Sequence, residues 1–305
     1  MVDPRVSCEI SICVATCRRR EGLTRLLESL TRLEDPGVRW EVVVVDNDPE
    51  GSAVPVLARY GKRLPLRALA EPRRNIAHAR NRAIEDAAGA WLAFVDDDEE
   101  LQPSWLVAYW NRARASEIDG WFGPVLPVLE RNVTPWLGPR FYHRPRHATG
   151  ESIGAAEVRT SNALVRASLF RERRFDARLG LRGGSDTELF SKMLRAGARF
   201  AWCDEAIVHE YIPPARHCLR WLSQRAFRGG FVHTLLEVRR HGRRVGLRVA
   251  ARALGALLLF GLALPVAALA GRASAARVWL RGCTQAGHLW ALVGGDYAEY
   301  GAARG

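Results

Sequence analysis

The chain has 305 residues, of which 48% are hydrophobic and 26% charged, so its composition is that of a folded protein and excludes a disordered chain. This length suits one large α/β domain with an appendage. The net charge of +12 comes almost entirely from arginine and favours an anionic partner: a nucleic acid, an anionic lipid surface or a phosphorylated substrate. Ten arginines and one acidic residue, Glu237, lie between residues 216 and 252, so most of this charge is C-terminal.

The six cysteines contain no Cys-x-x-Cys pair and no zinc-like set, which predicts reduced thiols in a cytoplasmic protein. The N-terminus, MVDPRVSCEI, is too polar for a signal peptide. We therefore expect the main domain to stay in the cytoplasm.

The first hundred residues alternate short apolar strands with helices. Strands are predicted at 10–15, 41–45, 66–70 and 91–95, and helices at 22–33 and 76–88. Continuous apolar strands are typical of a parallel sheet covered on both faces. Their alternation with helices predicts an α/β domain with an open, mostly parallel, Rossmann-like sheet.

Beyond residue 101 the pattern is looser. We expect strands at 121–129, 158–166 and 200–209, a helix at 186–196, and a loop rich in proline, arginine and aromatic residues at 134–151. Pro213-Pro214 then interrupts the chain. This places a catalytic domain at 1–212 and an arginine-rich helical extension at 213–305.

The most informative segment is WLAFVDDDEEL, in which Asp96, Asp97 and Asp98 follow an apolar strand. Ligands of open α/β sheets bind beyond the carboxyl ends of the strands. Adjacent carboxylates repel one another, and a hard divalent cation relieves that repulsion. Alternation along an extended chain turns Asp96 and Asp98 to one side, so an Asp-x-Asp pair holding Mg²⁺ or Mn²⁺ against a diphosphate is one interpretation. A solvated acidic turn before a helix is the other.

Two further polar residues end neighbouring strands. Asp46 ends the EVVVV strand, and Thr16 follows the ISICVA strand, so both should face the same edge of the sheet. A carboxylate in this place commonly bonds a ribose hydroxyl or a base edge. No strand end carries a Gly-x-Gly-x-x-Gly or Gly-Lys-[Ser/Thr] loop, which argues against a dinucleotide or P-loop site.

The order of SICVATCRR, EVVVVDND, NIAHARNRAI, WLAFVDDDE and GGSDTELFSKML resembles the inverting family-2 glycosyltransferases with the GT-A fold, of the bacterial polysaccharide or glycolipid type. The resemblance covers roughly residues 8 to 212. It implies that Thr16 and Asp46 hold the nucleoside of a nucleotide-sugar, that Arg80 helps to hold base or phosphate, and that Asp96 bonds the ribose. It also implies that Asp98 coordinates the divalent cation.

The resemblance makes Asp186 the catalytic base, although the family motif usually reads Glu-Asp and this chain has Ser185-Asp186, with Glu188 nearby. A helix cap is compatible with that role. His209 would be a further metal ligand, or a structural histidine, and Arg225 and Arg228 would bind the diphosphate. The implied reaction is a direct displacement with inversion, in which one sugar passes from the donor, a UDP-sugar being favoured, to an acceptor hydroxyl. The segment QRAFRGG lacks the Gln-x-x-Arg-Trp spacing of processive synthases, which favours transfer of a single sugar.

The C-terminal extension contains 19 uncharged residues, 253–271, preceded by arginines and followed by an amphipathic segment that carries Trp279 and Trp290. This pattern predicts membrane association at the cytoplasmic face, peripheral or re-entrant. A packed helical hairpin and a true span are the alternatives. The acceptor would be a glycan or lipid-linked precursor, with no nucleic acid as partner.

Two other functions stay open at this point. A nucleotidyltransferase shares the architecture and the metal-binding aspartates, but would normally carry a glycine-rich phosphate loop where this chain has CVATCRRREG. A non-catalytic basic module for anionic lipid or nucleic acid would use the arginines alone. The acidic strand ends argue against nucleic acid, because without a metal they would repel its phosphates.

Overall fold

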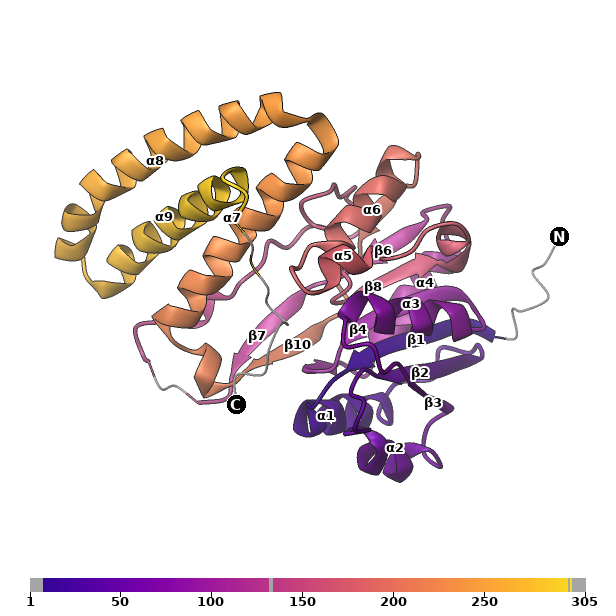
Figure 1. Ribbon diagram of the computed structural model, residues 1–305. Helices are drawn as coiled ribbons and strands as arrows, with labels where there is room; N and C mark the ends of the chain where they lie inside the picture. The colour runs from indigo at the N-terminus through magenta and orange to yellow at the C-terminus, as the bar shows by residue number, and fades with distance from the viewer. Residues whose placement is uncertain (1–7, 132–133, 296, 298–305) are drawn as a thin grey trace. The chain divides into compact units, whose positions relative to one another are not determined.

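The computed structural model describes residues 8–131, 134–295 and 297 (Figure 1). The chain divides into two compact units. The first takes the described residues up to 128, 143–180 and 185–211, and the second takes 129–142, 181–184 and those from 212 onward. The domain boundary expected after residue 212 stays a prediction.

The first unit is built on a mostly parallel sheet, as predicted. Within the described residues seven strands pair in the order β3-β2-β1-β4-β8-β6-β9. Their bounds are β1 Cys8–Thr16, β2 Trp40–Asp46, β3 Leu66–Ala70, β4 Gly89–Asp96, β6 Gly120–Phe122, β8 Ala163–Arg166 and β9 Phe200–Trp202. Only β8 runs against its neighbours. The carboxyl ends of the other six strands and the start of β8 therefore meet at one edge, called here the carboxyl edge.

Helices cover both faces of this sheet, which is why its strands are apolar without alternation. Ile10, Ile12 and Val14 of β1 pack on one face, with α1 Arg20–Leu30, α2 Val54–Tyr60 and α4 Trp105–Arg114. Cys13 points to the other face, against α3 Ile76–Asp86 and α6 Ser185–Arg195. The short α5 Ala177–Gly180 lies just before α6 in the chain.

The sequence prediction was wrong at two strands. The strand expected at 121–129 is β6 followed by β7 Val125–Leu129, and the strand expected at 200–209 is β9 followed by β10 Val208–Ile212. β7 and β10 belong to a second sheet, ordered β5-β10-β7, whose third strand is β5 Glu99–Leu101. The interruption between β6 and β7 includes Gly123. An added Cβ there would lie 2.5 Å from the carbonyl oxygen of Ala206, so the close approach of the two backbones requires glycine.

Other differences are smaller. The strand expected at 158–166 begins only at residue 163, because Asn162 has a φ of 65°, which ends extended pairing. The helices expected at 22–33, 76–88 and 186–196 are α1, α3 and α6, with ends shifted by one to three residues. The helices α2 and α4 and the strand β5 were not predicted.

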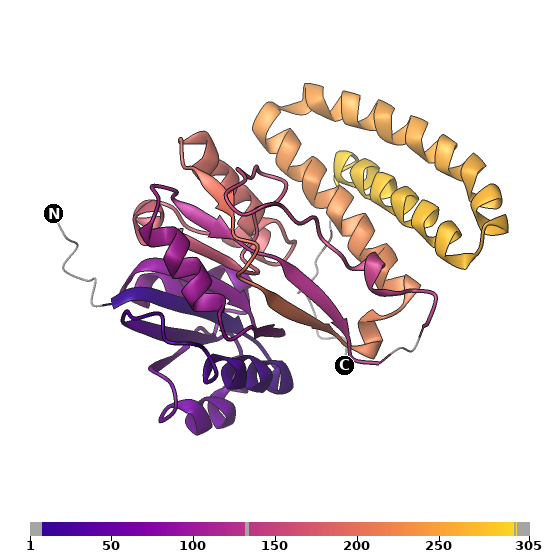
Figure 2. The same ribbon diagram turned by 180° about the vertical axis from the view of Figure 1, so that it is seen from behind.

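The second unit contains three long helices: α7 Leu219–His241, α8 Arg243–Leu269 and α9 Arg272–Leu292. In Figures 1 and 2, α9 runs between α7 and α8. Glycines allow the backbones of α7 and α9 to touch, since a Cβ at Gly287 would lie 1.9 Å from the Phe227 carbonyl oxygen and one at Gly230 2.0 Å from that of Thr284. The Thr234 hydroxyl and the His288 imidazole also bond at 2.8 Å. Hence α7 and α9 form one packed body.

This close approach predicts opposite effects for two glycines of α9. Gly287→Ala should destabilise the α7–α9 pair by about 1–3 kcal/mol, because the methyl group overlaps the α7 backbone. Gly282→Ala, whose Cβ meets nothing within 4 Å, should be neutral or should stabilise by up to about 1 kcal/mol through helix propensity. Thermal unfolding followed by circular dichroism compares the two variants, and equal melting temperatures would contradict the packing.

Candidate active site

Four consecutive acidic residues occupy the centre of the carboxyl edge. Asp96 ends β4, Asp97 and Asp98 form the turn, and Glu99 begins β5. The Asp96 backbone N–H donates to the Glu99 carboxylate at 2.9 Å, so the turn folds back on itself. The strand-end position predicted from WLAFVDDDEEL is confirmed.

Arginines from two other elements balance part of this charge. Arg80 of α3 donates to the Asp96 carboxylate at 3.1 Å. One terminal nitrogen of Arg19, just before α1, donates to both Asp97 and Asp98 at 2.9 Å. Asp97 is buried and also accepts the Thr16 hydroxyl at 2.8 Å. Asp97 therefore ties the end of β1 to the acidic turn.

Burial and mutual repulsion raise the pKa of three of these acids, Asp96, Asp97 and Glu99. Burial raises the pKa of Asp97 to about 6, against the attraction of Arg19. Burial raises the pKa of Glu99 well above its usual range, and Asp96 adds to the shift. Desolvation also raises the pKa of Asp96, although 38% of this side chain stays open to solvent, which moderates the effect. Burial thus disfavours the charged forms of Asp96, Asp97 and Glu99 by more than the neighbouring arginines favour them.

The second sheet places Glu210 beside Glu99, and it places His209 on the opposite face of β10. In the antiparallel pairing of β5 with β10, Glu210 lies opposite Glu99 and His209 opposite Glu100. Because paired residues share a face and neighbours alternate, His209 faces away from Glu99. Glu210 bonds Arg144 at 2.9 Å and contributes to the raised pKa of Asp96. The expectation that His209 ends a strand is corrected, because β10 continues to Ile212, and its role as a metal ligand stays a prediction.

On the β1–β2 side, Thr16 and Asp46 are register partners, as their strand ends suggested. Asp46 is buried, and its carboxylate accepts the backbone N–H groups of Asp48 at 3.1 Å and Ala53 at 2.7 Å. Asp46 thus holds the turn that follows β2, and its role toward a nucleoside stays a prediction. Asn47, which was not among the predicted site residues, lies next to Asp46, and its side-chain oxygen accepts the Asn75 backbone N–H at 2.8 Å.

Asp186 lies in the first turn of α6, where its carboxylate accepts the Thr187 N–H at 2.8 Å. The helix begins at the carboxyl edge, because it leads back to the start of β9. Glu188, the alternative candidate for the catalytic base, is ion-paired with Lys192 at 2.6 Å. Its second carboxylate oxygen is buried and has no hydrogen-bond partner in the described structure. Glu188 is thus engaged within its own helix, and the choice of Asp186 as the base stays a prediction.

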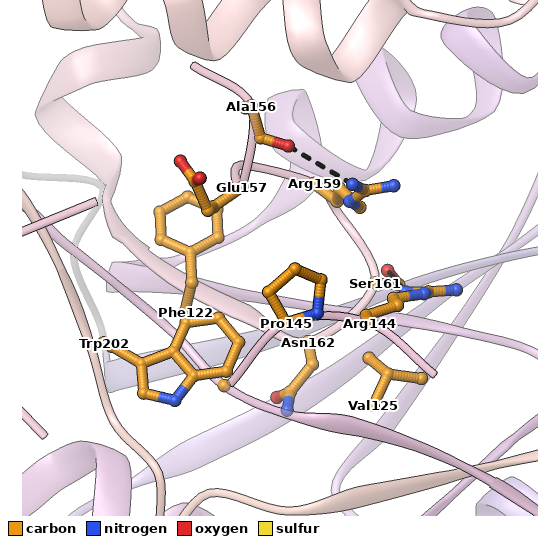
Figure 3. Close-up of a pocket in the computed structure, with 11 residues that line it drawn as sticks. Phe122, Val125, Arg144, Pro145, Ala156, Glu157, Arg159, Ser161, Asn162 and Trp202 are labelled. Atoms are coloured by element: carbon orange, nitrogen blue, oxygen red, sulfur yellow. Dashed lines mark hydrogen bonds between the residues drawn. The ribbon is translucent and has the colours of Figure 1, made fainter. Parts of the chain in front are cut away.

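A pocket of about 120 Å³ lies at the same edge, beyond β8, β6 and β9 (Figure 3). Arg144 lines it and donates to Ser161 at 2.8 Å as well as to Glu210, so this arginine joins the pocket to the acidic residues. Arg159, opposite Trp202 and Phe122 in the pocket, donates to the Ala156 carbonyl at 3.2 Å. Asp186 attracts the Arg159 guanidinium. Through these two arginines the pocket is linked to Glu210 by a hydrogen bond and to Asp186 by electrostatic attraction.

The fit of a divalent cation depends on the oxygens available. Within residues 8–131, 134–295 and 297 no group of three or more His, Cys, Asp or Glu side chains could hold a metal ion. Asp96 and Asp98 nevertheless offer carboxylates in one turn, and Mg²⁺ is commonly bound by one or two carboxylates together with substrate phosphates. The residues fit a cation shared with a diphosphate, and not one enclosed by protein.

Residues 11–174 match the model of the family described as "Glycosyl transferase family 2". The chain is also 35% identical over 309 residues to "Succinoglycan biosynthesis protein ExoM" of Rhizobium meliloti (strain 1021), with 98% of both chains covered. The chain is a family-2 glycosyltransferase. This membership excludes the nucleotidyltransferase and the non-catalytic basic module.

Solved structures agree with the fold of this glycosyltransferase. A fragment of S. aureus TarS, residues 1–349 in complex with UDP-GlcNAc, has a TM-score of 0.56 at 17% identity and covers 95% of this chain and 93% of its own. The mannosyltransferase PcManGT from Pyrobaculum calidifontis, in complex with GDP-Man and Mn²⁺, has a TM-score of 0.63 at 20% identity, with 95% and 88% covered. The expected GT-A architecture is confirmed.

Several residues of this glycosyltransferase site escaped sequence reasoning. Arg144 lies in the loop predicted at 134–151, and Glu210 directly follows His209 in β10. An alternating pattern in VHEYI was the available signal, since it separates His209 from Glu210. Arg225 and Arg228 lie on α7, in the second unit, so their assignment to the diphosphate stays a prediction.

Proposed function

We propose that this glycosyltransferase moves a single sugar, with inversion, from a nucleotide-sugar donor to a hydroxyl of a glycan or lipid-linked acceptor. The observation that carries the proposal is the order of groups along the carboxyl edge. Thr16 and Asp46 stand on one side of the acidic turn, and the pocket and Asp186 stand on the other. A nucleotide on the first side and an acceptor on the second would meet at Asp96–Asp98.

The donor is best matched by a UDP-sugar, which the TarS fragment binds as UDP-GlcNAc. Thr16, Asp46 and Asn47 would surround the nucleoside, and Asp96 with its partner Arg80 would contact the ribose and phosphate. Arg225 and Arg228 are proposed to bind the diphosphate. The guanidinium groups would offset the charge that develops on the leaving diphosphate.

A bound Mg²⁺ or Mn²⁺ would neutralise the diphosphate as a Lewis acid. Asp98 is the proposed ligand, with Asp96 beside it. The Mn²⁺ in the PcManGT complex supports this choice. Arg19 donates to Asp98 at 2.9 Å, and donor binding would turn this guanidinium toward a phosphate and leave Asp98 to the cation.

Asp186 is the proposed base. It would take the proton of the acceptor hydroxyl while that oxygen bonds the anomeric carbon from the face opposite the nucleotide. The bond from that carbon to the diphosphate oxygen breaks in the same step, so the configuration inverts and no covalent enzyme intermediate forms. Arg159, whose guanidinium is attracted to Asp186, would bond a neighbouring acceptor hydroxyl.

The proposed place of action is the cytoplasmic face of the inner membrane, with peripheral or re-entrant attachment. Among the described residues one helix, Arg244–Leu269, is long and apolar enough to cross a membrane, by length and composition. A lipid-linked acceptor would explain why a catalytic unit is held at this surface. The relative ExoM, named for succinoglycan biosynthesis, supports a polysaccharide precursor as acceptor.

The metal assignment predicts that Asp98→Asn lowers the affinity for a UDP-sugar in Mn²⁺ by at least about 10-fold, because a ligand to the cation is lost. Affinity in EDTA should not change. Calorimetry measures both, with Glu117→Gln as the control, since Glu117 is 93% exposed and distant in sequence from the motif. Wild-type affinity of Asp98→Asn in Mn²⁺ would show that the cation is held elsewhere.

The base assignment predicts that Asp186→Asn keeps donor affinity and loses about 10²–10⁴-fold in turnover. Glu188→Gln is the matched control, because its carboxylate is engaged by Lys192. Nucleotide release in the presence of acceptor measures turnover. An inactive Glu188→Gln beside an active Asp186→Asn would reverse the assignment.

The acceptor assignment predicts that Arg159→Gln raises the acceptor KM by about 10-fold, the effect of losing a hydrogen bond from a charged group. Donor hydrolysis without acceptor should not change. An octyl glycoside that accepts the sugar serves as probe, and Arg178→Gln, at a side chain 81% exposed, is the control. A changed donor KM with an unchanged acceptor KM would assign Arg159 to the donor.

A further inference from the structure

The outer side of α8 is an apolar surface left open to solvent. Its exposed large side chains are Leu247, Leu254, Leu258, Leu259, Leu262, Val266 and Leu269. The most apolar window of this helix has a mean hydropathy of 2.0, yet only 6% of it is buried. A core helix of a soluble unit would be mostly covered. Exposed apolar surface of this extent marks a binding face.

Three exposed arginines share this side of the helix. Arg244, Arg248 and Arg252 follow one another at intervals of four residues, which places them in one row. At 100° per residue this row falls on the same half of the helix as the leucines. The arginines occupy the first turns and the apolar residues the last ones. We call this graded surface the α8 face.

We propose that the α8 face binds an anionic lipid bilayer with the helix axis along the membrane plane. The inference deepens the proposed membrane location and rests on it. The leucines would enter the boundary between headgroups and acyl chains, where burial does not depend on salt. The arginines would lie at the level of the lipid phosphates, with their aliphatic stems along the apolar surface.

The packing of α9 argues against a span. The Cβ of an alanine at Gly246, near the start of α8, would lie 2.8 Å from Leu292, at the end of α9, so the two helices run antiparallel along their length. If α8 crossed the bilayer, α9 would return beside it. Arg281, nine residues after Arg272, would then be about 14 Å deep, near the middle of a core about 30 Å thick. Arg281 is exposed, and an exposed charge there is costly.

The contact of α9 with α7 strengthens this argument. Gly287 and Gly230 bring the two backbones together, so α9 cannot leave α7 without breaking that interface. A spanning hairpin would therefore draw α7 toward the bilayer, and α7 carries Arg220, Glu237 and Arg240. A helix lying in the interface avoids both costs.

A second copy of the chain matches the α8 face less well than lipid does. In a parallel pairing of two α8 faces the arginine rows would oppose each other. In an antiparallel pairing each arginine row would cover leucines. An anionic bilayer offers phosphates and an apolar layer together, and so complements both parts of the face.

Flotation of the full-length protein tests the lipid preference. Binding should be stronger to vesicles of phosphatidylcholine with phosphatidylglycerol than to pure phosphatidylcholine. Arg244→Gln, Arg248→Gln and Arg252→Gln together should lower the partition coefficient on anionic vesicles by about 100-fold. Leu258→Ser with Leu262→Ser, at side chains 73% and 76% exposed, should lower it by at least about 10-fold at low and at high salt.

Two exposed residues of the first unit serve as controls. Val54→Ser, at a side chain 60% exposed, and Arg39→Gln, at one 76% exposed, should bind vesicles like the wild type. Equal binding of all variants would overturn the proposal. So would a protein that ignores vesicles but changes from dimer to monomer in Leu258→Ser with Leu262→Ser, since a second copy would then cover the face.

Labelling distinguishes an in-plane helix from a span. Ala270, between α8 and α9, is exposed and can be replaced by cysteine. In spheroplasts of the Ala270→Cys variant, a membrane-impermeant maleimide should not label position 270 until the membrane is permeabilised. Mass spectrometry of the peptide that contains position 270 measures the labelling. Labelling from outside would overturn the in-plane arrangement. UDP-sugar hydrolysis by the same variants in detergent tests the catalytic proposal separately, because neither the vesicle nor the labelling readout requires turnover.

Discussion

Repulsion among four consecutive acids, Asp96 to Glu99, is the constraint around which the catalytic unit is organised. The chain places them at the end of a buried strand, where desolvation raises the pKa of Asp97 to about 6. Arg80 comes from α3, Arg19 from the start of α1, and Arg144 with Glu210 from later segments. Arg19, Arg80 and Arg144 thus offset part of this charge, and their ion pairs join three separate segments of the chain to the acidic residues of the carboxyl edge.

The same electrostatic surplus gives the edge its chemistry. The site contains more carboxylates than guanidinium groups. It therefore suits a ligand that carries a divalent cation on its phosphates, because the cation neutralises the remaining carboxylates. The aromatic and guanidinium-lined pocket next to it lacks that surplus, since Arg144 and Arg159 stand among its walls. A nucleotide-sugar therefore meets two distinct environments, one suited to its diphosphate and one to the acceptor that attacks its sugar.

Sequence reasoning located what depends on local patterns and failed where distant segments meet. Strand ends could be found because apolar runs stop at Thr16, Asp46 and Asp96, and the resulting sheet edge follows from parallel topology. Arg144 could not be found, because its partner Glu210 lies 66 residues away and a contact between a loop and a strand leaves no local pattern in the sequence. The strand end expected at His209 was wrong, since β10 continues to Ile212, because local residue types do not mark where pairing with a distant strand stops. The exposure of α8 was equally hidden, since composition does not distinguish a buried helix from a bare one.

The strand order has a consequence for how specificity can change. β3, β2, β1 and β4, which carry the proposed nucleotide side, come from the chain before residue 97, whereas β6, β8 and β9, which border the pocket, come after residue 119. Helix α4 separates these stretches in sequence and packs beneath the sheet, with Trp105 and Tyr109 both bonded to Asn162. Under the proposed assignment, the nucleoside side and the acceptor side come from consecutive parts of the chain, whereas the proposed diphosphate ligands Arg225 and Arg228 lie later, on α7. Recombination within the α4 segment would exchange one side and leave the other intact, a route by which relatives sharing this fold could combine sugars and acceptors independently.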